Sequence, residues 1–344
     1  MRKRPSSRVA DGIITVVTHA STHLPWTISA QMEESVAFIG IGAMGYGMAS
    51  NIRRNMSPSA TLYINDPNPD ACKSFILENS NVGPVEPVST AMEAAKKATV
   101  IITMLPRSEH VNDIYLDAST GVLAAASHSH LSNLMCIDSS TIDPGTTRAV
   151  GAALTEAGVG TYIDAPVSGG IAGATDGNLA FMVGHSTPHP RIQNVISLMA
   201  NPDKIFFCGP LGSGLASKIC NNYLCGTINI ALSESLALGI RSGVDPKVLL
   251  EVIKASSGQN WMLENHNPVP GLVESAPSSR GYERSFPITL MIKDLSLGVA
   301  AAEEVGIEPS MARRALETYQ RASEDEEVAE LDYTGVYQLI NRRG

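Results

Sequence analysis

Gly214, Lys218 and Asn222 follow one another at intervals of four residues in a proline-free stretch of the chain. Residues with this spacing share one face of a helix. This face would carry a residue without a side chain, a cation and an amide. Most helical lysines are merely solvated, but Lys218 lies in an otherwise apolar helix just past an expected domain junction, where α/β proteins tend to bind ligands. Glycine is destabilising near a helix start, so Gly214 indicates close approach of a cofactor or of the other domain.

A second candidate motif is a hydroxyl residue followed by paired glycines, Ser168, Gly169 and Gly170, directly after an expected strand. Backbone N–H groups of such a segment can turn inward as an anion nest, for which a carboxylate is a natural ligand. A flexible turn before Gly173 would explain the same residues. From this stretch alone the two interpretations stay open.

A glycine motif of the form G-x-G-x-x-G follows the first expected strand and opens a helix: Gly40, Gly42 and Gly45, with Ala43 and Met44 between the last two. The first glycine permits a tight turn, the second lets a pyrophosphate approach the backbone, and the third allows close helix–strand packing. Free N–H groups at the helix start would face the anion. A lone motif is often only a glycine-rich turn, but this one opens a βαβ unit and therefore predicts a dinucleotide site.

Asp66 ends the second expected strand, at the distance from the glycines where a ribose-binding acid is found. A carboxylate there accepts hydrogen bonds from the 2′-hydroxyl of NAD and repels the 2′-phosphate of NADP, which an arginine would favour. Residues 65–68 contain no arginine, so NAD is the predicted cofactor. Asp66 could instead cap the following helix, and both roles can hold.

The elements around these motifs alternate between short β-rich runs and helical stretches from Val36 onward, which is typical of a parallel sheet with crossover helices. The predicted strands are Val36–Ile39, Thr61–Asn65, Val100–Met104, Met135–Ile137 and Thr161–Asp164. The predicted helices between them are Met44–Arg53, Pro69–Glu78, Ala91–Lys97, Arg107–Tyr115 and Thr146–Ala157. Leu179–Val183 and Ile205–Phe207, on either side of a helical stretch at Arg191–Met199, are expected to extend this sheet.

The β signal largely disappears after Gly209–Pro210, and Ser213–Arg241 is expected to form one long helix that ends before Gly243. Further predicted helices are Pro246–Ala255, Ile288–Val305, Pro309–Ser323 and Thr334–Asn341, with a loop at Asn265–Ser285. The predicted fold class is therefore α/β: an N-terminal Rossmann-type, doubly wound and mostly parallel sheet over 36–210, followed by an all-α domain over 211–344.

Composition restricts the partners of the chain. It has 344 residues, 44% of them hydrophobic, and a formal net charge of -9. Nothing resembles a basic stripe that would release counterions from nucleic acid, and no uninterrupted apolar run reaches the roughly 20 residues of a membrane-spanning helix. Five cysteines without C-x-x-C spacing and the lack of a His/Asp/Glu cluster predict no metal. We expect a soluble protein, and the long apolar helix is compatible with a homodimer or tetramer.

The first 35 residues differ from the rest, because Arg2, Lys3, Arg4 and Arg8 open the chain and no acid occurs between Asp11 and Glu33. Frequent serine and threonine add to the resemblance to a mitochondrial transit peptide. We therefore predict the mitochondrial matrix as the location. A disordered tail, for example from a misassigned start codon, is the alternative.

The motifs together resemble the β-hydroxyacid dehydrogenase family, and within it the 3-hydroxyisobutyrate dehydrogenases, from Phe38 nearly to the C-terminus. The matching motifs are FIGIGAMG, PDACKSF at Pro69–Phe75, IITMLP at Ile101–Pro106, IDSSTIDP at Ile137–Pro144, DAPVSGG, KICNN and the Lys293–Asp294 pair. The segment Ser256-Ser-Gly258 with Trp261, and NPVPG at Asn267–Gly271, look characteristic of the 3-hydroxyisobutyrate dehydrogenases. The resemblance implies NAD-dependent oxidation of 3-hydroxyisobutyrate to methylmalonate semialdehyde, a step of valine degradation.

The resemblance also implies roles for individual residues. Lys218 would be the catalytic lysine and Asn222 its substrate-positioning partner. The substrate carboxylate would be held by Ser168, Gly169 and Gly170. The NAD site would be lined by Leu105, Pro106 and Thr141, with Lys293 beside both cofactor and substrate. Two positions depart from the family pattern: His110 replaces a cofactor-contacting asparagine, which leaves that edge of the NAD site in doubt, and His185 replaces a glycine.

A lysine suits this reaction because oxidation of an alcohol needs a base for the hydroxyl proton. Lys218 must then react as the neutral amine, although the pKa of a free lysine is about 10.4. Desolvation between two domains and the positive ring of NAD⁺ would both lower that pKa. Another family member acting on a related acid, such as tartronate semialdehyde, is the rival enzyme; a non-catalytic nucleotide-binding scaffold is a third possibility, but would be expected to lack the lysine.

Overall fold

The computed structural model of the protein describes residues 33–126 and 129–342. The predicted transit segment over 1–35 therefore lies outside the described residues, apart from its end at Glu33, Glu34 and Ser35. Glu34 already belongs to the folded chain, because its carboxylate pairs with Arg191 at 2.5 Å and accepts a hydrogen bond from the Thr99 hydroxyl at 2.7 Å.

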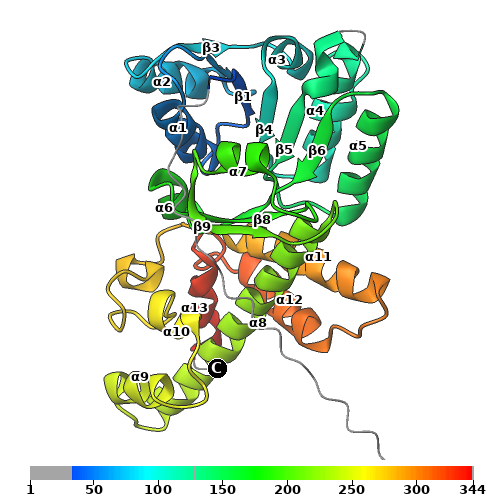
Figure 1. Ribbon diagram of the computed structural model, residues 1–344. Helices are drawn as coiled ribbons and strands as arrows, with labels where there is room; N and C mark the ends of the chain where they lie inside the picture. Colours follow the sequence, from blue (N-terminus) through cyan, green and yellow to red (C-terminus); the bar gives the residue numbers. More distant parts are fainter. Residues whose placement is uncertain (1–32, 127–128, 343–344) are drawn as a thin grey trace, which may run out of the picture. The chain divides into compact units, whose positions relative to one another are not determined.

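The larger sheet has six parallel strands in the order β3-β2-β1-β4-β5-β6 (Figure 1). Its strands are β1 (Val36–Ile39), β2 (Leu62–Asn65), β3 (Val85–Pro87), β4 (Val100–Thr103), β5 (Met135–Asp138) and β6 (Thr161–Asp164). The predicted strands are confirmed with ends shifted by at most one residue. The strand β3 was missed because Pro87 argues against a strand, but proline is tolerated at the edge that β3 occupies. This order is that of a doubly wound nucleotide-binding sheet, so the predicted fold class is confirmed.

Both faces of the larger sheet are covered, as alternate residues of β1 show. Val36 and Phe38 belong to the apolar core that includes residues of α1 (Gly45–Asn55) and α2 (Pro69–Asn79). Ala37 and Ile39 belong to a different core, built with α3 (Ala91–Lys97), α4 (Ser108–Leu116) and α5 (Pro144–Glu156). A parallel strand buried on both sides reads as a continuous apolar run, which is why β1 was predicted with its correct ends.

A second sheet of three strands corrects one prediction. Its strands β7 (Val167–Ser168), β8 (Leu179–Val183) and β9 (Ala200–Phe207) pair in that order, β7 with β8 antiparallel and β8 with β9 parallel. The prediction that Leu179–Val183 and Ile205–Phe207 extend the large sheet was therefore wrong. After β6 the chain turns into β7, which pairs with β8 in the antiparallel direction instead of continuing along β5. Two short helices, α6 (Gly170–Thr175) and α7 (Pro190–Ile196), connect these strands.

The chain after β9 is helical (Figure 1). The long helix α8 (Ser213–Arg241) has the predicted ends, and Gly243 follows it with a φ of 89°, the left-handed conformation common after helices. The remaining helices are α9 (Pro246–Lys254), α10 (Trp261–Asn265), α11 (Ile288–Glu304), α12 (Ser310–Ser323) and α13 (Val336–Ile340), with 3₁₀ turns at Pro277–Arg280 and Tyr333–Gly335. A third apolar core joins α8, α11, α12 and α13. The division into domains at residue 210 falls between β9 and α8 and stays a prediction.

Helix α8 is the one helix of the described residues that is long and apolar enough to span a membrane by length and composition. Several of its polar side chains are nevertheless buried within the protein: Lys218, Asn222, Asn229 and Ser233. The Asn229 amide donates to the Tyr319 hydroxyl of α12 at 2.8 Å. We therefore interpret α8 as the central helix of a protein core.

Candidate active site

The glycine loop between β1 and α1 is shaped by the chain's own packing. Gly40 has a φ of 96°, and a Cβ atom added to it would lie 2.4 Å from the Met104 carbonyl oxygen. A Cβ atom on Gly45 would lie 1.8 Å from the carbonyl oxygen of Gly40, so this turn and the helix behind it require glycine. At Gly42, by contrast, an added Cβ would meet nothing within 4 Å, which leaves space in front of the loop.

The start of α1 fits an anionic group at this loop. Gly42 and Ala43 are exposed, and the N-cap residue Met44 makes no side-chain hydrogen bond to the helix start. The first N–H groups of an eleven-residue helix thus lack a side-chain cap and suit a pyrophosphate.

Asp66 lies beside the glycine loop, as its position after β2 predicted. One of its carboxylate oxygens accepts a hydrogen bond from the Ile41 N–H at 2.7 Å, and the other accepts one from the Asn68 N–H at 2.8 Å. The N-cap of α2 is Asn68, whose side chain accepts from the Asp70 N–H at 3.1 Å, so the alternative that Asp66 caps this helix was wrong. Asp66 instead ties the end of β2 to the glycine loop.

The loops after β4 and β5 are held together by a buried carboxylate that sequence reasoning had not singled out. Asp138 accepts hydrogen bonds from the Thr103 hydroxyl at 2.8 Å, the Tyr162 hydroxyl at 3.0 Å and the Ser140 N–H at 3.1 Å. The Ser140 hydroxyl in turn accepts from the Leu105 N–H at 2.9 Å. Burial raises the pKa of Asp138, and these hydrogen bonds oppose that rise.

The predicted cofactor residues of these loops thus lie at the carboxyl edge of the large sheet, where doubly wound folds bind ligands. A Cβ atom added to Gly40 would be 3.2 Å from a methyl carbon of Leu105, so Leu105 adjoins the glycine loop. Pro106 follows it and is exposed, as is His110 on the first turn of α4.

Lys218 lies on the buried side of α8, with only 8% of its surface exposed. Burial lowers the pKa of its ammonium group below the usual range; the carboxylate of Asp294 opposes this effect and the ammonium of Lys293 reinforces it. Asn222, one turn further along α8, is 6% exposed and donates a hydrogen bond of 2.5 Å to Asp294. The predicted face of α8 is therefore a buried, polar surface.

A chain of polar contacts joins this face to the nucleotide-binding edge. Asp294, on α11, is in ionic contact with Lys293 at 3.1 Å and accepts the hydrogen bond from Asn222. Lys293 donates to the carbonyl oxygen of Thr141, in the loop after β5, at 2.6 Å. The structure thus places Asn222 and Lys293 on Asp294, and Lys293 also on Thr141. Asp294 was named only as part of the Lys293–Asp294 motif and was given no role, although a carboxylate beside Lys293 in an apolar helix was a signal.

The Ser168–Gly170 segment forms the junction between β7 and α6. Ser168 pairs with Ala180 of β8, and the two glycines follow with φ angles of 142° and 64°. An added Cβ on Gly170 would meet nothing within 4 Å, so its backbone borders open space. The segment is therefore a strand-to-helix junction with Gly173 inside α6, and both interpretations of it stay open.

Gly214 explains how α8 meets the second sheet. A Cβ atom at this position would lie 2.1 Å from the Met182 carbonyl oxygen of β8. Of the two causes considered for this glycine, the close approach of another part of the protein accounts for it. His185 lies just beyond β8, where its ring nitrogen Nδ1 is 2.6 Å from the Thr187 carbonyl oxygen.

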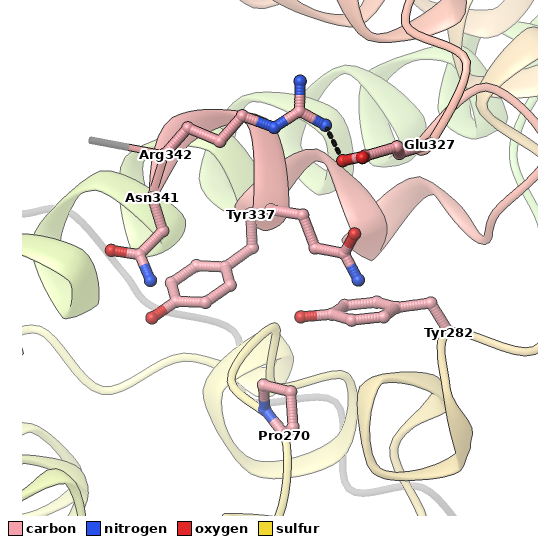
Figure 2. Close-up of a pocket in the computed structure, with 7 residues that line it drawn as sticks. Pro270, Tyr282, Glu327, Tyr337, Asn341 and Arg342 are labelled. Carbon is pink, nitrogen blue, oxygen red and sulfur yellow. Dashed lines mark hydrogen bonds and ion pairs between the residues drawn. The ribbon is translucent and has the colours of Figure 1, made fainter. Parts of the chain in front are cut away.

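The described residues contain a pocket away from this site and no cluster of metal-binding side chains. A pocket in the helical part, beside the Arg342–Glu327 ion pair of 2.8 Å, is lined by Tyr282 and Tyr337 and by none of the predicted site residues (Figure 2). Among the residues that the structure describes, no group of three or more His, Cys, Asp or Glu side chains is arranged to hold a metal ion.

Comparison with known families decides what kind of protein carries this arrangement. Residues 35–209 match the family model for the NAD binding domain of 6-phosphogluconate dehydrogenase, and residues 212–340 match that for the NAD-binding of NADP-dependent 3-hydroxyisobutyrate dehydrogenase. The chain belongs to the β-hydroxyacid dehydrogenase family. The predicted cofactor was NAD, and the comparisons confirm a nicotinamide cofactor, NAD(P), and the nature of the protein as an oxidoreductase.

Individual relatives of this β-hydroxyacid dehydrogenase span nearly its whole length. It is 37% identical over 306 residues to the mitochondrial 3-hydroxyisobutyrate dehydrogenase of Bos taurus, covering 89% of this chain and 86% of that protein. It is also 37% identical over 310 residues to the NAD-dependent L-serine dehydrogenase of Pseudomonas aeruginosa, covering 90% and 98%. The solved structure of Mycobacterium tuberculosis 3-hydroxyisobutyrate dehydrogenase with L-serine is similar, with a TM-score of 0.78, 34% identity and coverage of 90% and 100%.

Proposed function

We propose that the protein oxidises 3-hydroxyisobutyrate to methylmalonate semialdehyde with NAD⁺ as the acceptor, as a step of valine catabolism. The observation that carries the proposal is the buried Lys218–Asn222 face of α8, linked through Asp294 and Lys293 to the loop that carries Thr141. A non-catalytic scaffold would have no need to bury a lysine at the nucleotide edge.

The acid/base role belongs to Lys218 in this proposal. When bound, NAD⁺ would accept the hydride from the carbon that carries the hydroxyl. The Nζ atom of Lys218, as the neutral amine, takes the proton of the substrate hydroxyl; in the reverse direction the ammonium form returns a proton to the aldehyde oxygen. Burial favours the neutral amine, since it lowers the Lys218 pKa. Asn222, fixed by its hydrogen bond to Asp294, orients the hydroxyl without adding charge.

The substrate carboxylate binds at the β7–α6 junction in our proposal. Ser168 offers a hydroxyl donor, and the backbone of Gly169 and Gly170 can approach an anion closely because neither residue has a side chain. Open space next to Gly170 supports this assignment.

The cofactor site is assigned to residues of the carboxyl edge of the large sheet. They are Gly40, Gly42, Ala43, Met44, Gly45, Asp66, Leu105, Pro106, His110, Thr141 and Lys293. Asp66 favours NAD over NADP, because its carboxylate stands beside the loop where a 2′-phosphate would be repelled. Because the second family model is named for an NADP-dependent enzyme, paired assays with NAD and NADP test this preference.

L-Serine is the second candidate substrate. One relative is named an L-serine dehydrogenase, and the similar solved structure is of a complex with L-serine. L-Serine and 3-hydroxyisobutyrate both carry a carboxylate and, on the carbon next to it, a hydroxymethyl group. Both would therefore make the same contacts with the Ser168–Gly170 segment and with Lys218.

The cellular setting is also a proposal. The basic, acid-poor N-terminus and the mitochondrial bovine relative support the mitochondrial matrix. A bacterial relative is equally similar, so fluorescence microscopy of the full chain and of a chain lacking residues 1–35 is the appropriate test.

A homodimer or tetramer is proposed from the long apolar α8 and is tested by the mass of the native protein in solution.

The substrate assignment is tested by the formation of NADH from purified protein. We expect the highest kcat/KM with 3-hydroxyisobutyrate, lower values with L-serine and glycerate, and reduction of tartronate semialdehyde only at a low rate. A higher kcat/KM with L-serine would replace the first candidate by the second. Absence of NADH formation from all three hydroxy acids would contradict the enzyme class.

A further inference from the structure

The carboxylate of Asp164, at the end of β6, is fully buried and reaches into the first turn of α8. One oxygen accepts a hydrogen bond from the Gly212 N–H at 2.8 Å, and the other accepts one from the Leu215 N–H at 2.8 Å. Both acceptors of this side chain are therefore used by the helix that carries Lys218.

Helix α8 depends on this carboxylate for its cap. Its N-cap residue is Gly212, which has a φ of 92° and no side chain that could accept from the first N–H groups. A helix start that is buried without acceptors is destabilised, because its first N–H groups have no partner within the helix. Asp164 supplies the missing cap from a strand 48 residues earlier in the chain.

Two further glycines make room for the same carboxylate. A Cβ atom on Gly184 would lie 1.7 Å from one Asp164 oxygen, and a Cβ atom on Gly214 would lie 2.9 Å from the other. The Gly184 N–H also donates to the Asp164 carbonyl oxygen at 2.7 Å. The end of β6, the end of β8 and the start of α8 thus meet around one side chain.

We propose that Asp164 is a positioning residue, which fixes helix α8 so that Lys218 keeps its place relative to the Ser168–Gly170 segment. Asp164 precedes Ser168 by four residues, and Leu215 precedes Lys218 by three. One carboxylate therefore joins the two segments between which the substrate would bind. The inference rests on the proposed function, since it concerns the geometry of that same site.

The direct test is Asp164→Asn, which keeps the shape of the side chain but turns an NH₂ group toward one of the two N–H donors. We expect kcat to fall about 10- to 100-fold, because small displacements of a catalytic group have effects of this size. The dissociation constant of NADH, measured by fluorescence, should change by less than about 3-fold, since the glycine loop is untouched. Asp245→Asn is the control: the exposed Asp245 caps α9 with one oxygen, Oδ1, which accepts from the Lys247 and Val248 N–H groups, and its replacement should leave kcat unchanged.

A second readout does not depend on turnover. The rate at which acetic anhydride modifies Lys218 is followed against pH by mass spectrometry in each variant. Displacement of α8 would expose the amine, so we expect the midpoint of this profile to rise by about one pH unit in Asp164→Asn. Asp294, Lys293 and Cys225, the charged and titratable groups that face Lys218, are unchanged in this variant, so the shift would report position.

If Asp164→Asn does not fold, Gly184→Ala tests the same point, because its methyl group, just after β8, would displace the Asp164 carboxylate. The same fall in kcat and the same rise in the modification midpoint are expected. A wild-type kcat together with a wild-type modification profile would overturn the inference, as would equal changes in Asp245→Asn. If no hydroxy acid is oxidised even by the wild type, the proposed function fails, while the modification profile still decides the role of Asp164.

Discussion

The glycine loop and the lysine face of α8 are built in opposite ways. At the loop, Gly45 is constrained by the carbonyl oxygen of Gly40 within the same βαβ unit, and Gly40 by the carbonyl oxygen of Met104, which follows β4. At the lysine face, Asn222 depends on Asp294, which is 72 residues away, and Lys293 depends on Thr141, which is 152 residues away. The shape of the glycine loop is therefore set partly within one βαβ unit, whereas that of the lysine face depends on contacts between distant segments.

The largest expected effect is that of Lys218→Ala, which separates the two regions. Removal of a general base should lower kcat by about 100- to 10,000-fold, while NADH affinity is nearly kept. Lys254→Ala, at a lysine paired with Glu251 on the exposed side of α9, is the control and should behave as the wild type. Steady-state kinetics and NADH fluorescence measure both quantities; turnover near the wild-type rate would refute the role of Lys218.

Two glycine variants test the glycine loop without touching the lysine face. Gly45→Ala should lower the melting temperature and abolish tight NADH binding, because its Cβ would collide with the Gly40 carbonyl. Gly42→Ala meets no protein atom and should fold normally, but should weaken NADH binding by about 10-fold or more because the methyl group stands where the pyrophosphate approaches. Equal melting temperatures and equal affinities for the two variants would contradict these separate roles.

Asp66→Arg is expected to have the smallest effect on the fold and a clear one on cofactor choice. The change removes the carboxylate that repels a 2′-phosphate and supplies a cation that attracts it. The ratio of kcat/KM with NAD to that with NADP should fall by about 10-fold or more, while kcat with the preferred cofactor changes little. An unchanged ratio would show that Asp66 serves only to hold the Ile41 N–H.

The sequence predicted best what depends on neighbouring residues. The ends of β1, β6 and α8 were predicted correctly, because apolar runs and the glycine after α8 mark them locally. The positions of Asp66 beside the loop and of Lys218 on a buried face also followed from spacing. The same reasoning failed for the choice of sheet, which apolar runs do not encode: β8 pairs with β7 and β9 in a second sheet and not with the large one.

The parts of the site that sequence reasoning missed are carboxylates whose partners are remote. Asp138, Asp164 and Asp294 are all buried, and each accepts hydrogen bonds from elements that no local pattern connects to it. A buried carboxylate must be satisfied, so each of them fixes the geometry of its neighbours. Only the fold reveals which neighbours these are.

The central claim, that Lys218 acts as a neutral amine, is tested most directly by the pH dependence of kcat/KM for the oxidation of 3-hydroxyisobutyrate. Burial lowers the pKa of Lys218, so the active, neutral form accumulates as pH rises through this lowered value. We predict that the rate increases with pH, with a midpoint clearly below the value of about 10.4 for free lysine, and levels off above that midpoint. The reduction of the aldehyde should decrease as pH rises. A profile that is flat across this range, or that is retained with full activity in Lys218→Arg, would contradict the account.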